Sequence, residues 1–239
     1  IFPLISDGTY TQNYGPTTVM INDEVGSLEA NGAALGVGAG GWGGALRVRK
    51  QFAQLFNDGI YINDSRNTLI SENRNIEITD ISDKDQGYVI EKYSNATSIG
   101  TFGADQTFVD TDFPLFRLAD VYLMYVEAHL RGGVGASATD AENYINSLRT
   151  RANNPQNTLT ISDLTLDFIL DERSRELHWE AHRRQDLIRF NKFTGGSYNW
   201  AWKGNGSNGI AISNNLKVFP IPAASLAANP NLTQNIPWR

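Results

Sequence analysis

The stretch DFPLFRLADVYLMYVEA, residues 112–128, decides the fold class of this chain of 239 residues. Its apolar residues recur with the period of an α-helix and fall on one face, at Leu118, Val121, Tyr122, Tyr125 and His129. Pro114 suits a first helical turn, and Gly132 and Gly133 suit a stop. The spacing therefore predicts a helix between these two signals.

A second helix follows with its own start and stop. Ser137 and Asp140 have the Ser-x-x-Asp spacing of a capping box, and Pro155 ends the segment. Between them apolar residues step by three and four positions, at Ala138, Ala141, Ile145, Leu148 and Ala152. Because the connection is short and rich in Gly, we expect the two helices to form an antiparallel αα-hairpin.

A third and longer helix is predicted to begin between Thr160 and Thr165 and to continue to about Phe190. It carries opposite charges three or four positions apart, a pattern typical of a solvent-exposed helix face. The pairs are Asp171 with Arg175, Glu180 with Arg184, and Asp186 with Arg189. After it we expect an aromatic loop, a short extended segment at residues 216–219, and a tail rich in Pro and Asn.

The composition changes near residue 112. Residues 1–111 are rich in Gly and Asn and hold short β-prone pieces such as residues 87–93, which predicts loops with short strands. Residues 112–239 form the helical region, so the fold class is mainly α with extensive irregular loops. Because one hairpin of the tetratricopeptide type cannot bury its own face, we expect the loop-rich half or further repeats before Ile1 to cover it.

The composition also excludes several functions. A net charge of −6 and a pI near 5.1, without any run of Lys or Arg, argue against nucleic acid as a partner. The absence of cysteine excludes disulfides, thiolate zinc sites and cysteine nucleophiles. No stretch has the roughly 18 apolar residues of a membrane span. The chain opens on Ile1 without Met, which we interpret as the start of a piece of a longer protein.

Two patterns that resemble cofactor or metal sites lack the right context. Residues 36–41 match G-x-G-x-x-G, but no strand precedes them and no amphipathic helix follows. His178 and His182 have the i, i+4 spacing of metal ligands, yet His129 is the one other histidine. No nucleophile elbow or P-loop is present. We therefore predict no catalytic residue, no cofactor and no metal site.

Aromatic side chains on loops are the candidate ligand-binding residues. Trp42 lies in a Gly-rich run, and Tyr198, Trp200 and Trp202 share the loop of residues 195–205 with Asn, Ser and Lys. Sugars offer CH faces that stack on rings and hydroxyls that need polar partners. The same rings could instead anchor a long loop to the body of the protein, and both interpretations stay open.

Several segments together resemble the SusD/RagB family, the outer-membrane nutrient-binding lipoproteins of Bacteroidetes-type bacteria. Residues 112–128 carry the resemblance with VFPIP at residues 218–222 and NPNLTQN at residues 229–235. Between these lie Asn146, Arg149, Arg151, Ala152, Glu172, Arg173, Glu176, Leu177, Glu180, Arg183, Asp186, Leu187, Ile188 and Arg189; weaker matches are Asp64-Ser65-Arg66 and Lys92-Tyr93. The chain departs from the family at Val126, at Ala181 and at residues 236–238, where the family more often has Ala, Gly and a Pro-Gly-type ending.

The resemblance implies a tetratricopeptide-like scaffold, of which this chain is a C-terminal portion with residues 1–111 facing the ligand. It implies a non-enzymatic receptor that captures an oligosaccharide or polysaccharide and delivers it to a SusC-like TonB-dependent transporter. The N-terminal half of the same protein would be a further partner, and a lipid on that absent half would anchor the receptor at the cell surface. The charged residues from Glu172 to Arg189 would then form a scaffold network.

Two other functions stay open beside glycan binding. A peptide receptor of the RagB type would present a groove with unpaired backbone partners, whereas a glycan receptor would expose flat aromatic faces. A glycoside hydrolase would need a pair of carboxylates at a separation that sequence does not fix. The motifs do not specify which glycan is bound or whether calcium is present.

Overall fold

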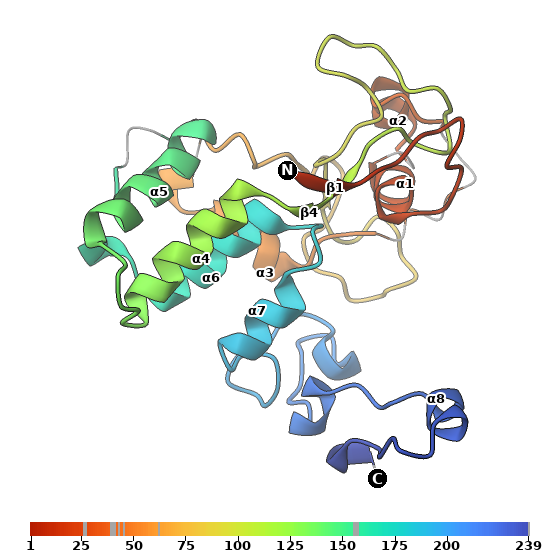
Figure 1. Ribbon diagram of the computed structural model, residues 1–239. Coiled ribbons are helices and arrows are strands. Elements are labelled where there is room, and N and C mark those ends of the chain that lie inside the picture. The colour runs from red at the N-terminus through yellow and green to blue at the C-terminus, as the bar shows by residue number, and fades with distance from the viewer. Residues whose placement is uncertain are drawn as a thin grey trace. The chain divides into compact units, whose positions relative to one another are not determined.

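The computed structural model describes residues 1–25, 28–38, 42, 44, 46–61, 63–154 and 158–238. Contacts divide the chain into two compact units, Ile1–Arg183 and Arg184–Arg239. The described residues are mainly helical, with few short strands and long irregular loops, as predicted (Figure 1). The domain boundary near residue 112 stays a prediction.

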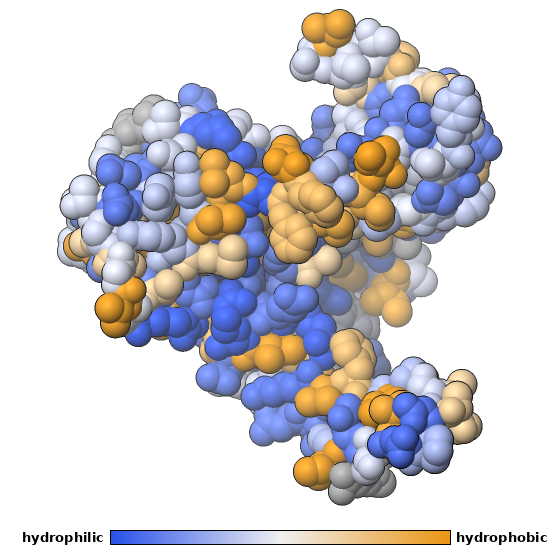
Figure 2. Space-filling model, in the orientation of Figure 1, coloured by the Kyte–Doolittle hydropathy of each residue, from blue (hydrophilic) through white to orange (hydrophobic). Residues whose placement is uncertain are grey.

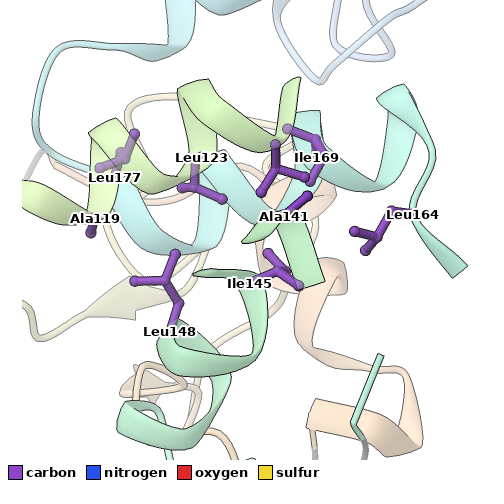
Figure 3. Close-up of a cluster of buried hydrophobic side chains, with 9 residues drawn as sticks. Ala119, Leu123, Ala141, Ile145, Leu148, Leu164, Ile169 and Leu177 are labelled. Carbon is purple, nitrogen blue, oxygen red and sulfur yellow. The ribbon is translucent and has the colours of Figure 1, made fainter. Parts of the chain in front are cut away.

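Three helices carry the largest apolar core of the first unit. α4 (Leu118–Leu130) and α5 (Ala138–Arg151) form the predicted hairpin, and α6 (Leu166–Leu177) also packs against α4. The prediction of Pro114 in the first turn of α4 was wrong, because Pro114 lies in a strand that ends two residues before the helix. Side chains from all three helices meet between them (Figure 3), and Leu123, Val126, Ile145 and Ile169 are fully buried there. Burying a side chain of this size contributes roughly 1.5–3 kcal/mol.

The buried face of α4 differs from the predicted one. Leu123 and Val126 are fully buried, whereas Leu118 and Val121 are 60% and 50% exposed. Tyr122 lies at the margin of the core, partly buried. The prediction was wrong for Leu118 and Val121 because α4 is apolar around most of its circumference, so its period alone does not select the side that faces α5 and α6.

The turn into α5 confirms the predicted cap, with one change. Ser137 Oγ accepts a hydrogen bond from the Asp140 backbone N–H at 3.0 Å, which is the first half of a capping box. In place of the second hydrogen bond of a capping box, the Tyr125 side chain of α4 bridges Ser137 and Asp140. Its hydroxyl accepts the Ser137 N–H at 2.9 Å and donates to Asp140 Oδ2 at 3.2 Å. The start of α5 is thereby tied to α4.

The predicted third helix is broken. A 3₁₀ turn (Ile161–Asp163) precedes α6, which ends at Leu177, and α7 spans Arg183–Arg189. Between them Trp179 and Ala181 have φ angles of 58° and 63°, in the left-handed region that interrupts a helix. The prediction of one helix to Phe190 was wrong because Trp179 leaves the helix axis to pack against a separate cluster, formed by Val48, Ala53 and Ile90.

Loops and two small sheets make up the rest of the first unit. β1 (Phe2–Leu4) pairs antiparallel with β4 (Phe113–Phe116), and β2 (Leu69–Ile70) with β3 (Val89–Ile90). Short helices lie along the loops: α1 (Pro16–Met20), a π-helical turn (Ile21–Val25), α2 (Glu29–Ala34), α3 (Lys50–Ala53), and 3₁₀ turns at Gln54–Phe56 and Gly59–Tyr61. α1 and the π-helical turn follow each other without a break from Pro16 to Val25, so the prediction that no helical stretch here exceeds about two turns was wrong.

The second unit is built from turns and side-chain bonds to the backbone. Its elements after α7 are 3₁₀ turns at Lys203–Asn205, Asn214–Lys217 and Ile236–Trp238, and α8 (Ala223–Ala228). The turn at Asn214–Lys217 replaces the start of the extended segment predicted at residues 216–219. Gln234 Oε1 accepts the Ile221 N–H at 2.8 Å and its Nε2 donates to the Ile221 carbonyl at 3.0 Å, which ties the tail to the segment before α8. Among the described residues, none of the helices has the length and apolar character to cross a bilayer.

Candidate functional site

Three glutamates spaced four residues apart bring charge into the interior of the first unit. Glu172 and Glu176 lie on α6, and Glu180 lies in the turn after it; their side chains are at most 1% exposed. Residues four apart lie on the same face of a helix, so Glu172 and Glu176 point the same way. The charge spacing favoured a solvent-exposed face, and for these three residues that prediction was wrong. We call them, with the cations that bind them, the ion network.

Arg66, from the loop before β2, organises the first half of the ion network. Its Nη1 donates to Glu172 at 2.8 Å and to Glu176 at 2.9 Å, while its Nε and Nη2 donate to the two oxygens of Asp64. Arg175 donates to the other oxygen of Glu172 at 2.8 Å. Burial alone would raise the pKa of Glu172, but Arg66 and Arg175 outweigh burial and lower it to about 2. Glu172 is therefore ionised and fully paired.

Arg117, which directly precedes α4, organises the second half. Its Nη1 donates to Glu176 at 2.6 Å and its Nε donates to Glu180 at 2.6 Å. Arg151, at the end of α5, donates to Glu176 at 2.5 Å, and Lys92, after β3, donates to Glu180. The ion network thus joins the loops around both sheets to α4, α5 and α6, which is the scaffold role that the resemblance implied.

A cavity of about 690 Å³ lies over the ion network, with Lys92, Arg117 and Glu180 in its wall. Tyr93 and Pro114 complete parts of the rim. This volume is typical of sites for small ligands. Lys92 and Arg117 already donate to carboxylates and backbone carbonyls, so the charges of these two lining residues are compensated within the wall of the cavity.

His178 lines the same cavity, just after the end of α6. α6 ends at Leu177, so His178 and His182 are not neighbours on a helix, and the alternative of a helical ligand pair was wrong. The described residues hold no group of three or more His, Cys, Asp or Glu side chains that could bind a metal ion. Burial, together with the charge of Lys92, lowers the pKa of His178 to about 3. The ring is neutral, and its Nδ1 donates to the Arg175 carbonyl at 2.9 Å.

Trp42 belongs to an aromatic row of the first unit. Its ring, partly buried, lies 6.0 Å from that of Tyr14, and Tyr14 lies 5.3 Å from Phe108. Tyr14 is 69% exposed, so the row opens to solvent. Part of the surrounding Gly-rich run, including residues 39–41 of the G-x-G-x-x-G match, lies outside the described residues.

The aromatic loop lies in the second unit, where its rings contact one another. Trp200 stacks on Phe193 at 6.0 Å and lies 6.2 Å from Tyr198, and all three rings are partly buried. The Lys203 ammonium group lies 4.8 Å from the Trp200 ring centroid and donates to two loop carbonyls at 2.6 and 2.7 Å. Trp202, with a φ of 66°, starts the 3₁₀ turn that follows. These contacts hold the loop in place and leave part of each ring accessible.

The four predicted binding residues thus fall into two groups. Trp42 is in the first unit and Tyr198, Trp200 and Trp202 are in the second, so each group is a candidate site by itself and all four remain predictions. The cavity over the ion network is the feature that sequence reasoning missed. Its one local signal was the spacing of Glu172, Glu176 and Glu180, because the cations come from distant segments.

Comparisons with known proteins agree with the resemblance. A sequence profile of the SusD family matches residues 58–238. The chain is 40% identical over 162 residues to the starch-binding protein SusD of Bacteroides thetaiotaomicron, an alignment that covers 68% of this chain and 28% of that protein.

Solved structures show the same fold. A SusD superfamily protein from Bacteroides vulgatus has a TM-score of 0.55 and 28% identity, with 80% of this chain and 39% of that chain covered. A SusD homologue from Bacteroides thetaiotaomicron has a TM-score of 0.63 and 22% identity, with 100% of this chain and 46% of that chain covered. The chain spans less than half the length of these relatives.

Proposed function

The chain belongs to the SusD family, and on this premise we propose that it is part of a cell-surface receptor that binds an oligosaccharide. The observation that carries the proposal is the 40% identity to a starch-binding protein over 162 residues. The proposal extends to delivery of the glycan to a SusC-like TonB-dependent transporter. It also includes the N-terminal half of the same protein as a partner, with a lipid on that half as the anchor in the outer membrane.

The chemistry of the ion network supports binding without catalysis. A general acid for glycoside hydrolysis needs a carboxyl group whose pKa is raised toward neutrality. Glu172 has a pKa of about 2, and Arg117 and its neighbours lower the pKa of Glu176 although burial would raise it. Both groups stay ionised and paired at neutral pH. We assign them to the scaffold and assign no catalytic residue.

We assign ligand contact to Trp42, Tyr198, Trp200 and Trp202. Partly buried rings held by their neighbours lose little side-chain entropy when a sugar stacks on them. At the aromatic loop, exposed Ser197 and Asn199 lie beside the rings and can bond sugar hydroxyls. The sites in the two units would bind separate parts of a glycan or separate glycans.

Isothermal titration against a panel of oligosaccharides tests this proposal. Trp42→Ala and Trp200→Ala should each weaken binding about tenfold, because stacking on one ring contributes about 1 kcal/mol or slightly more. Tyr10→Ala, which removes a ring that is 87% exposed, is the control and should change nothing.

The panel also separates the alternatives. Wild-type affinity in both Trp variants would refute the assignment of these binding residues, while the proposal of a glycan receptor would stand. Binding of peptides but of no glycan would replace the proposal by a peptide receptor. Shortened oligosaccharide in the recovered sample would replace it by a hydrolase.

A further inference from the structure

Charge is distributed very unevenly between the two units. Residues 1–183 contain 25 Asp or Glu and 14 Lys or Arg, whereas residues 184–239 contain one Asp and six Lys or Arg. The side chains of the first unit therefore sum to −11 and those of the second to +5. The total of −6 conceals this contrast. A small basic unit attracts anions over about a Debye length, roughly 8 Å at physiological salt.

The single carboxylate side chain of the second unit is already engaged. Asp186 is 2% exposed, and its Oδ1 accepts a hydrogen bond from Arg189 Nη2 at 2.7 Å. Arg184 donates instead to the backbone carbonyls of Leu216 and Lys217. Carbonyl groups satisfy hydrogen bonds without cancelling charge, so the unit keeps a net positive charge when it is folded.

Two lysines of the second unit lie beside rings of the aromatic loop. The Lys192 ammonium group lies 5.5 Å from the Tyr198 ring centroid, and Lys203 lies 4.8 Å from that of Trp200. Asn199, between the two rings in sequence, is exposed. Lys203 is buried and holds the loop, so the cation beside the rings that is partly accessible is Lys192, which precedes the loop. The loop and Lys192 together therefore offer a stacking face, an amide and a cation.

We propose that the glycan bound by the second unit is acidic and carries uronate carboxylates or sulfate esters. This rests on the proposed function and specifies its ligand. The CH face of the sugar ring stacks on Tyr198 or Trp200, and the anionic group lies at Lys192. Exposed Ser197 and Asn199, next to the rings in sequence, can bond hydroxyl groups, which favours a sugar over a surface of anionic phospholipid.

Titration with oligogalacturonate, a sulfated oligosaccharide and a neutral maltooligosaccharide of matched length tests the inference. In about 0.02 M NaCl the acidic ligands should bind at least about tenfold tighter than the neutral one, and in about 0.5 M NaCl this difference should shrink to less than about twofold. Lys192→Gln should weaken the acidic ligands about fivefold and leave the neutral one unchanged. Lys84→Gln makes the same charge change at an exposed lysine of the first unit and should have no effect.

Each outcome has a distinct meaning. Equal affinity for neutral and acidic ligands at low salt overturns the inference and leaves the receptor function intact, while no binding of any glycan overturns both. Binding to vesicles of anionic phospholipid without binding to acidic oligosaccharides also overturns it. Should Lys192→Gln lose the wild-type circular dichroism spectrum, Lys192→Met, which keeps an unbranched stem beside Tyr198 and removes the charge, takes its place, and unchanged acidic affinity in the folded variant overturns the placement at this loop.

Discussion

Ala181 has a left-handed backbone conformation, which is strained for a residue with a Cβ atom but not for glycine. Its φ of 63° is one of the two left-handed angles that break the chain between α6 and α7. Ala181→Gly should raise the free energy of unfolding by about 0.5 kcal/mol, since relief of roughly 1–2 kcal/mol of strain exceeds the entropy that glycine adds to the unfolded chain.

The control is Ala128→Gly, at an exposed position inside α4, which should lower the free energy of unfolding by about 1 kcal/mol. Urea unfolding followed by circular dichroism measures both changes. Equal destabilisation by the two substitutions would show that position 181 is not strained.

Glu24 is a buried acid that the ion network does not include. Burial raises its pKa from 4.5 to about 8, although the hydrogen bond from the Ile90 N–H opposes the shift. The folded state therefore keeps a proton that the unfolded state releases. The stability that Glu24 contributes is fully present below about pH 4.5 and is lost by up to about 1.4 kcal/mol per pH unit as the pH rises toward 8.

Glu24→Gln keeps an oxygen that accepts the Ile90 N–H and removes the titrating group. Between pH 5 and pH 8 the free energy of unfolding of this variant should therefore fall less with pH than that of the wild type. Glu77→Gln, at a half-exposed carboxylate paired with Lys50, should keep it. Chemical unfolding at several pH values gives both curves. A Glu24→Gln curve parallel to the wild type would refute the raised pKa.

At the scale of elements, Glu176 joins the most segments. Its carboxylate accepts from Arg66, Arg117 and Arg151, and its side chain is 1% exposed. Glu176→Gln leaves these cations short of one negative charge in a buried site, which should cost about 3–5 kcal/mol of stability. Thermal unfolding measures this loss; Glu72→Gln, at an exposed position, should change the midpoint little. Equal unfolding midpoints for Glu176→Gln and the wild type would mean that the ion network does not hold α6 to the loops.

The elements that sequence predicted well are those with local signals. The Ser137 cap of α5 could be predicted because Ser137 and its partner Asp140 are three residues apart in sequence. The hairpin could be predicted because the helical period and the turn residues between the helices are also local signals. The break after α6 was missed because Trp179 is drawn to a cluster built from distant residues. Likewise, Arg66 and Glu176 are 110 residues apart, a pairing that no local spacing reveals, so the cavity over the ion network was missed.

At the scale of the whole molecule, the surface shows where further contacts can form. Apolar side chains are exposed in patches on the visible face (Figure 2), and Phe2, Phe116, Leu118 and Val121 of the first unit are each at least 50% exposed. The aromatic loop could be picked out from sequence because its composition is local, whereas the opposite charges of the two units emerge only once their boundary is known.

Equilibrium dialysis of the chain against an oligosaccharide panel, followed by mass analysis of the recovered sugars, tests the receptor claim most directly. We expect saturable retention of at least one glycan, with its mass unchanged after prolonged incubation. Retention of none, or recovery of shortened sugars, would contradict it.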